Sequence, residues 1–344
     1  MLCRAMADPV LTFTDRGIYC PAGDFHIDPW RPVESALITH GHADHARWGH
    51  RRYLATDGAA PVIRHRLGDI AIETIRYGET RRIGGATVSF HPAGHLPGSA
   101  QIRVEVGGAV WVVSGDYKTD ADGLSEPFEP VRCHAFVSEC TFGLPVFTWA
   151  PQADIAAEVN AWWAANAAEG RTSILGAYSL GKAQRILSLV DPGIGPILTH
   201  GAVEGTNGVL RAQGYPLPDT TQVTPETKGR DAPGALVLAP PSALGTPWAR
   251  RFGTASTAFA SGWMRLRGVR RRRAADRGFV LSDHADWDGL IGAIRETGAE
   301  NIYVTHGYTD IFARWLNQNG WNADVVPTEF GSEEEDDTAA TDAA

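Results

Sequence analysis

Cysteine is scarce in this sequence and shows no regular spacing. The four cysteines, Cys3, Cys20, Cys133 and Cys140, form no CxxC pair. This pattern gives no sign of a disulfide framework, so we interpret the four as free thiols in a reducing compartment. Cys140 stands beside a candidate site residue, but a small buried apolar side chain is the simpler interpretation.

Long apolar runs are also missing. No segment approaches the roughly 18 apolar residues that a membrane-spanning helix needs. The first eight residues carry one arginine and lack the apolar stretch of a signal peptide. Both absences predict an intracellular, cytoplasmic protein that does not associate with membranes.

The net charge of −9 comes mainly from one segment. Residues 332–344 hold six acidic and no basic groups, so the remaining chain has 31 basic and 34 acidic residues, a balance of −3. We predict that this acidic tail is disordered and solvated. The near-neutral remainder is compatible with a nucleic-acid partner.

Metal-ligand side chains, in contrast, are densely clustered. His40, His42, Asp44 and His45 directly follow the apolar residues 36–38, which predict a strand. Two histidines and a carboxylate–histidine pair at this spacing suit two adjacent ions better than one. Such ligands favour Zn²⁺ and also accept Mn²⁺ or Fe. The segment therefore predicts a metal-binding loop, the alternative being a polar loop with chance histidines.

Two later loops carry further ligand candidates. His95 lies in a Gly/Pro-rich turn after a predicted strand at 87–90, and Asp116 follows a predicted strand at 109–114. Three such loops in this order resemble the metallo-β-lactamase superfamily. The resemblance implies that His40, His42 and His95 hold one divalent ion, that Asp44 and His45 hold a second, and that Asp116 bridges both. His91 is expected to be structural or to support a ligand.

The order of predicted elements suggests an inserted domain. Short strands dominate residues 1–146, at 10–13, 36–38, 70–74, 87–90, 101–106, 109–114 and 135–138. A helix at 154–168 and strand–helix units at 173–190 and 197–209 then predict a parallel-sheet domain over 147–265. Predicted strands at 279–282 and 302–305 suggest that residues 266–331 return to the first domain.

This arrangement resembles the β-CASP nucleases, whose cap domain interrupts an αβ/βα metallo-β-lactamase sandwich. Glu139 before the insertion, the segment 177–185, His284 in Leu281-Ser-Asp-His-Ala-Asp286 and His306 in Val304-Thr-His-Gly307 match the family's motifs in order. The chain is most similar to bacterial DNA-ligase-associated exonucleases. The resemblance implies a two-metal phosphodiesterase, a DNA exonuclease that functions in repair beside a DNA ligase.

The resemblance also implies roles for the later residues. His306 would complete the ligand set of the second ion, and His284 would protonate the departing oxygen while Glu139 orients its imidazole. With Asp44 and Asp116, these residues form the expected catalytic set. The alternatives are a metal ligand or a structural histidine for His284, and an ordinary surface carboxylate for Glu139.

Candidates for substrate contact are weaker. Ser179 and Lys182 open a predicted helix, where backbone N–H groups and the lysine could bind a phosphate, although Ser179 could simply be an N-cap. Six arginines could contact nucleic acid or form a solvated face: Arg265, Arg267, Arg270, Arg271, Arg272 and Arg273. His200 is expected to be a turn residue.

Three other functions remain open at this point. An RNA-processing nuclease of the same fold is one, because in this family the histidine equivalent to His306 accompanies RNA cleavage. A small-molecule metallo-hydrolase is another, although the long insertion disfavours it. A catalytically inactive nucleic-acid-binding subunit is the third, although such proteins lose ligands that are all present here.

Overall fold

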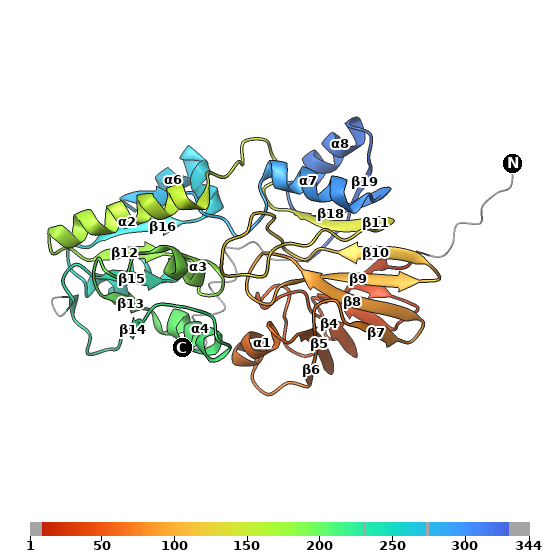
Figure 1. The fold of residues 1–344 in the computed structure, drawn as a ribbon, viewed down its shortest axis with the longest axis horizontal. Helices are drawn as coiled ribbons and strands as arrows, with labels where there is room; N and C mark the ends of the chain where they lie inside the picture. The colour runs from red at the N-terminus through yellow and green to blue at the C-terminus, as the bar shows by residue number, and fades with distance from the viewer. Residues whose placement is uncertain (1–8, 230–231, 273–274, 330–344) are drawn as a thin grey trace, which may run out of the picture.

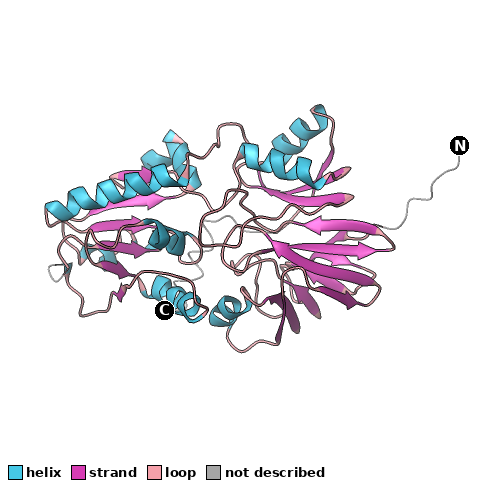
Figure 2. Cartoon of the chain, in the orientation of Figure 1, coloured by secondary structure: helices cyan, strands magenta, loops and turns pink. Residues whose placement is uncertain are grey.

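The structure, a computed structural model, describes residues 9–229, 232–272 and 275–329. The predicted acidic tail and Arg273 lie outside the described residues, and the side chains of Arg270–Arg272 are not described either. Figure 1 shows two α/β units side by side, and Figure 2 shows that each unit combines sheets with helices on their faces. Two chain segments, at about 141–151 and 280–286, connect the units.

The first unit contains two sheets. The first sheet has the order β1 (Thr12–Thr14), β2 (Gly17–Cys20), β3 (Phe25–Ile27), β4 (Ser35–Leu37), β5 (Arg52–Thr56) and β6 (Ile72–Ile75). The second has the order β19 (Asn322–Val325), β18 (Asn301–Gly307), β11 (Ala135–Cys140), β10 (Ala109–Val113), β9 (Ala100–Val106), β8 (Ala86–Pro92) and β7 (Thr80–Ile83). Both sheets mix parallel and antiparallel pairs.

These two sheets pack face to face and carry helices on their outer faces. Their shared core includes Ile27 of β3, Val88 of β8 and Trp111 of β10. Helix α1 (Ala60–Leu67) covers the outer face of the first sheet, and α7 (Trp287–Thr297) and α8 (Thr309–Gln318) cover the second. The helix–sheet–sheet–helix order is the αβ/βα layering that the resemblance implies.

The second unit is built on a fully parallel sheet. Its order is β14 (Thr221–Gln222), β13 (Ile197–Thr199), β15 (Leu236–Ala239), β12 (Ser173–Gly176), β16 (Ser256–Ala260) and β17 (Arg277–Phe279). Its helical segments are α2 (Gln152–Ala168), α3 (Lys182–Leu189), α4 (Gly201–Ala212), η2 (Pro241–Ala243), α5 (Pro247–Arg250), η3 (Gly262–Arg265) and α6 (Arg267–Arg272). Every residue of β12 and β15 is buried, because helices cover both faces of the sheet.

The prediction of an α/β fold that includes a helix-flanked parallel sheet is confirmed, and the structure adds that both sheets of the first unit are mixed. The predicted return to the first unit at residue 266 is too early, because β17 pairs with β16 and Phe279 is buried in the core of the parallel sheet. The strand expected at 279–282 is β17 and ends at Phe279. In the described part of the chain, every helix is too short or too polar to cross a bilayer.

Candidate metal centre

Loops at the ends of the strands bring the predicted ligands to one place. His40 to His45 follow β4, His95 lies between β8 and β9, Asp116 follows β10, and His306 lies near the end of β18. The parallel strands β10, β11 and β18 end at one edge of their sheet. This edge faces the second unit, where the Leu180 carbonyl lies 3.2 Å from Nε2 of His42.

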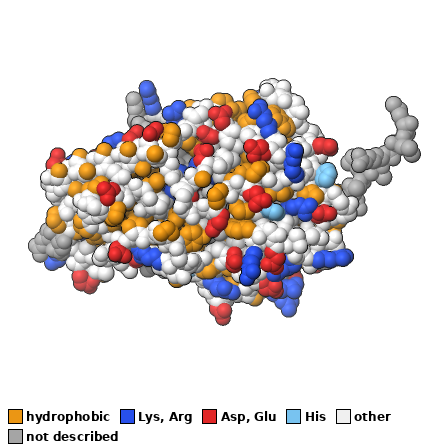
Figure 3. Space-filling model, in the orientation of Figure 1, with side chains coloured by type: hydrophobic (Ala, Val, Ile, Leu, Met, Phe, Trp, Pro, Cys, Tyr) orange, Lys and Arg blue, Asp and Glu red, His pale blue; other side chains and the backbone are white. Residues whose placement is uncertain are grey.

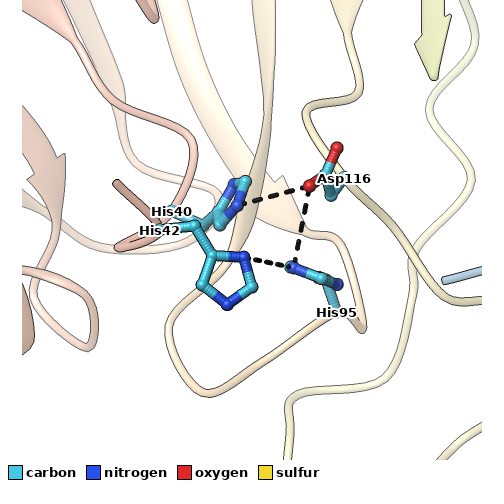
Figure 4. A group of neighbouring side chains, drawn as sticks. All are labelled: His40, His42, His95 and Asp116. Atoms are coloured by element: carbon cyan, nitrogen blue, oxygen red, sulfur yellow. Dashed lines mark hydrogen bonds and ion pairs between the residues drawn. The ribbon is translucent and has the colours of Figure 1, made fainter. Parts of the chain in front are cut away.

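The first group consists of His40, His42, His95 and Asp116, whose ligand atoms all lie within 4.8 Å of one another (Figure 4). Oδ2 of Asp116 is 3.5 Å from Nε2 of His40 and 3.8 Å from Nε2 of His95. Nε2 of His95 is 3.1 Å from Nδ1 of His42. Two atoms bound tetrahedrally to one Zn²⁺ lie roughly 3.3–3.6 Å apart. The observed spacing fits a shared ion.

A second group adjoins the first. Nε2 of His45 lies 3.5 Å from Oδ2 of Asp44 and 3.5 Å from Oδ2 of Asp116. Nε2 of His306 is 3.7 Å from Oδ2 of Asp44. The same Asp116 oxygen therefore contacts both groups, which is the arrangement expected of a bridging carboxylate.

The protonation states of His40 and His95 also suit metal binding. Burial, with the neighbouring His45, holds the pKa of His40 well below its ordinary value, and burial with His284 and His42 lowers the pKa of His95 to about 3. Both rings are therefore neutral at neutral pH, as ligands must be. Burial by itself raises the pKa of Asp116, but His45 and His284 reverse this effect and hold it well below the usual range.

Two buried atoms of the cluster lack a hydrogen-bond partner among the described residues. Nε2 of His40 and Oδ1 of Asp116 make no hydrogen bond to any described residue. Buried polar atoms are nearly always satisfied, because leaving them without a partner costs about 1–3 kcal/mol. A divalent cation would satisfy both atoms, so the residues present fit a metal site.

The ligands are themselves oriented by neighbours that the sequence analysis missed. The carboxylate of Asp28 contacts Nδ1 of His45 at 2.8 Å and accepts hydrogen bonds from the hydroxyl and backbone N–H of Thr39. The Asp283 carbonyl lies 2.9 Å from Nδ1 of His95. Partners of this kind fix ring orientation in metal sites. An aspartate before a proline looks like a turn residue in the sequence, so Asp28 had no distinctive signal.

Backbone geometry contributes at two positions. Gly115 adopts φ +57, and a Cβ there would lie 2.6 Å from Oγ1 of Thr39, so this approach of β10 to the histidine loop requires glycine. His306 has φ +55, an uncommon conformation for a non-glycine residue. Conformations of this kind cost about 1–3 kcal/mol and cluster at functional sites.

Beside the metal ligands lies a histidine–carboxylate pair. Nδ1 of His284 is 2.7 Å from Oε1 of Glu139, and both side chains are buried. The Glu139 carboxylate also accepts backbone N–H groups of Tyr117 and Thr141, at 3.2 and 3.1 Å. Glu139 is therefore no ordinary surface carboxylate. Asp116 groups with this pair within 4.8 Å, which places the imidazole next to the candidate metals.

The candidates for substrate contact occupy different positions. Lys182 is fully buried, with Nζ 3.6 Å from Oδ2 of Asp283, so the expected phosphate contact is not at the surface. Ser179 is partly buried and precedes α3, whose N-cap is Gly181. Arg265 is exposed, and its guanidinium donates to the Val146 carbonyl in the first connection between the units. Arg267 is also exposed.

The remaining predicted residues lie outside the cluster. His91 contacts Oγ of Ser89 at 3.0 Å, and His200 is the N-cap of α4, accepting from the Ala202 N–H. Cys140 is buried, as expected.

Comparison with known proteins finds relatives whose names describe a ligase or a ribonuclease. A protein named Probable DNA ligase from Opitutus terrae is 28% identical over 311 residues, 89% of this chain and 30% of that protein. Endoribonuclease YSH1 from Candida albicans is 30% identical over 122 residues, 35% of this chain and 14% of that protein. Ribonuclease TTHA0252 from Thermus thermophilus is 28% identical over 147 residues, 35% of this chain and 34% of that protein.

The chain is a metallo-β-lactamase/β-CASP-like protein. No protein-family model matches it. This metallo-β-lactamase/β-CASP-like chain spans only 14–34% of the length of these three relatives. A solved structure, a protein of unknown function from Enterococcus faecalis V583, shares the fold with a TM-score of 0.59 at 10% identity, covering 87% of this chain and 80% of its own.

Proposed function

We propose that this chain is a two-metal phosphodiesterase that degrades nucleic acid, and that it acts on DNA from an end. The observation that carries the proposal is the clustering of seven ligand candidates, Asp116 among them, with the His284–Glu139 pair beside them. If two divalent ions are bound there, Zn²⁺ or alternatively Mn²⁺, they would supply an activated water and neutralise charge on the phosphoryl oxygens. His40, His42 and His95 would hold one ion, Asp44, His45 and His306 the other, and Asp116 both.

His284 and Glu139 provide the proton-transfer step. With Nδ1 bound to Glu139, the imidazole presents Nε2 as the atom that donates a proton to the leaving oxygen. Glu139 is held by two backbone N–H groups, so it fixes the ring in one orientation.

The parallel-sheet unit corresponds in this proposal to a β-CASP cap, from about residue 147 to the end of β17. The Leu180 carbonyl of this unit and the Asp283 carbonyl of the second connection contact His42 and His95, so in this proposal the cap and its connection complete the site rather than merely cover it. Basic and acidic side chains are interspersed on the face seen in Figure 3. Attraction of a phosphodiester would therefore depend on local groups at the junction of the units.

DNA is favoured because the match to the protein named Probable DNA ligase covers most of this chain. On this basis we propose a role in ligase-associated repair. The second candidate is a ribonuclease, favoured by the two named ribonucleases and by the presence of His306.

The test is direct. Metal-loaded protein is incubated with end-labelled DNA and RNA of one sequence, single- and double-stranded, and with closed single-stranded DNA circles. We expect faster loss of linear DNA than of RNA, with circles intact. Faster RNA cleavage would transfer the assignment to the ribonuclease, rapid cutting of circles would show endonuclease activity, and no cleavage with both ions bound would refute a nuclease.

A further inference from the structure

A pocket lies where the two connections between the units meet, next to the metal centre but outside the set of ligands. Its volume is about 460 Å³, within the range of roughly 300–1,000 Å³ typical of small-molecule sites. We name it the junction pocket and define it by Lys118, Trp149, Gln152, Arg185 and Ser282, which are among its lining residues.

Lys118 is the unusual member of this lining. The residue is 2% exposed, and its closest ion-pair partner is Asp120, which also lines the pocket and whose Oδ2 lies 3.7 Å from Nζ. That distance is too long for a hydrogen bond. Asp120 is itself 73% exposed, so it is a weak partner for a buried charge. An anion that enters the pocket would stabilise this largely buried ammonium.

A second buried cation stands in the same wall. Arg185 is 4% exposed, and its guanidinium donates to Gln152 and to the Ser282 carbonyl, with Oδ1 of Asp283 at 3.5 Å. Asp283 is shared with Lys182, so one carboxylate faces two cations.

The remaining carboxylate nearby is already occupied. Asp122 is buried, and its carboxylate accepts the N–H groups of Leu124 and Ser125 and the hydroxyl of Ser125. The three cations Lys118, Lys182 and Arg185 therefore stand near three carboxylates, those of Asp120, Asp122 and Asp283. Lys118 differs from the other two because its nearest carboxylate, that of Asp120, is exposed to solvent.

The pocket is joined to the proposed proton donor through two short contacts. The indole N–H of Trp149 donates to the His284 carbonyl at 2.9 Å, and Oγ of Ser282 accepts the His284 N–H at 3.1 Å. Lys118 is two residues from Asp116 in the chain. A ligand in the pocket would thus touch the same segments that hold the catalytic groups.

A second hollow shares part of this lining. Ala150, Ile155 and Val280 also line a space of about 440 Å³, whose other lining residues include the basic Arg265 and Arg277 and the acidic Glu158 and Asp276.

We propose that the junction pocket binds a phosphate group of a nucleotide, with Lys118 and Arg185 as the cationic contacts. The phosphate part rests on the pocket alone, whereas the nucleotide part rests on the proposed nuclease function. A planar guanidinium and an ammonium are the groups that proteins commonly use for phosphate.

The experiment measures binding of radiolabelled inorganic phosphate to metal-loaded protein by equilibrium dialysis, with dAMP and deoxyadenosine as competitors. Because phosphate also binds metal centres, the number of equivalents is counted. The test variant is Lys118→Met, and the matched control is Lys228→Met, which alters an exposed lysine of the second unit. The chain has three lysines, so Lys228 is the available exposed control.

We expect wild type and Lys228→Met to bind one equivalent of phosphate with the same affinity. Lys118→Met should bind this equivalent roughly ten- to hundredfold more weakly, which is the usual contribution of one charge-assisted hydrogen bond. Deoxyadenosine should not compete. If dAMP competes more tightly than phosphate, the preferred ligand is a nucleotide. If the two have equal affinity, the ligand is free phosphate, and the nucleotide part of the proposal is refuted. Equal binding by Lys118→Met and wild type would overturn the proposal, because water alone would then satisfy Nζ.

Two further arms keep the result interpretable. If Lys118→Met fails to fold, photolabelling of the wild type with azido-dAMP decides: label in residues 118–121 or 149–152 supports the pocket, and label confined to other segments refutes it. Nuclease activity is measured separately. If phosphate binding depends on Lys118 but the protein cleaves no nucleic acid, only the proposed nuclease function is refuted. If the protein is an active nuclease but phosphate binding does not depend on Lys118, only the proposed phosphate site is refuted.

Discussion

Replacing Glu139 with glutamine tests the proton-transfer arrangement with little change in shape. The carboxylate uses Oε1 for His284 and the Tyr117 N–H, and Oε2 for the Thr141 N–H. A glutamine retains one acceptor. If its oxygen stays with His284, its amide N–H₂ faces the Thr141 N–H, donor against donor.

The magnitude follows from these contacts. One buried N–H without a partner costs about 1–3 kcal/mol of stability, and a charge-assisted hydrogen bond is stronger than a neutral one by about 1–1.5 kcal/mol. If that difference is present in the transition state, the rate falls roughly 5- to 15-fold. The alkaline limb of the pH–rate profile should also move to lower pH, because a carboxylate stabilises a charged imidazole better than an amide does.

The assay is single-turnover cleavage of an end-labelled oligonucleotide across pH, with metal content measured in parallel. Glu129→Gln is the matched control, since Glu129 contacts His91 at 3.4 Å in a histidine–carboxylate pair outside the cluster. We expect the control to behave as wild type and Glu139→Gln to keep both metals. A full rate with an unshifted profile would show that Glu139 does not act through His284, and a lost metal would make it a ligand.

Four further results are expected. Asp116→Ala should lose metal and activity together, because its Oδ2 contacts both ligand groups; full metal content by elemental analysis would contradict a bridging role. His284→Ala should keep both ions and lose on the order of 10²–10⁴-fold in rate; loss of an ion would make it a ligand. Alanine at Arg270–Arg273 should weaken nucleic-acid binding and flatten its salt dependence, by about 0.7 in slope per single-strand phosphate contact; unchanged binding would leave the run a solvated face. Burial, with His26 and Arg47, lowers the pKa of His50 to about 4. Because the folded state resists protonation of His50, the free energy of unfolding should fall by roughly 1–2 kcal/mol as pH drops from about 6.5 toward 4. The difference in unfolding free energy between wild type and His50→Gln, measured in urea, should therefore change over the same pH range. A difference that stays constant would contradict this prediction.

The metal ligands could be found in the sequence because their signal is local. His40, His42, Asp44 and His45 occupy one loop, and Asp116 comes directly after an apolar strand. The hydrophobic pattern of the sequence predicts where strands end, and in α/β folds functional groups gather at strand ends. The resemblance to the β-CASP nucleases, not this local pattern, predicted His284 and Glu139 as site residues, and the structure brings their side chains to 2.7 Å.

The domain limit was harder to predict because it depends on pairing between distant strands. An apolar segment near Phe279 looks the same whether it joins one sheet or another. Its register against β16 and its burial in the core of the parallel sheet decide the matter, and neither is encoded within the segment itself.

The sequence alone thus determined which side chains have metal-ligand chemistry and in what order they follow strands, since these are properties of neighbouring residues. Only the tertiary structure decided which partners orient them. Asp28 behind His45, the Leu180 carbonyl behind His42 and the burial of Lys118 and Lys182 all arise from segments that meet after long chain separations. Hydrogen bonds and desolvation depend on what surrounds a group in space, so a residue's own sequence context does not reveal them.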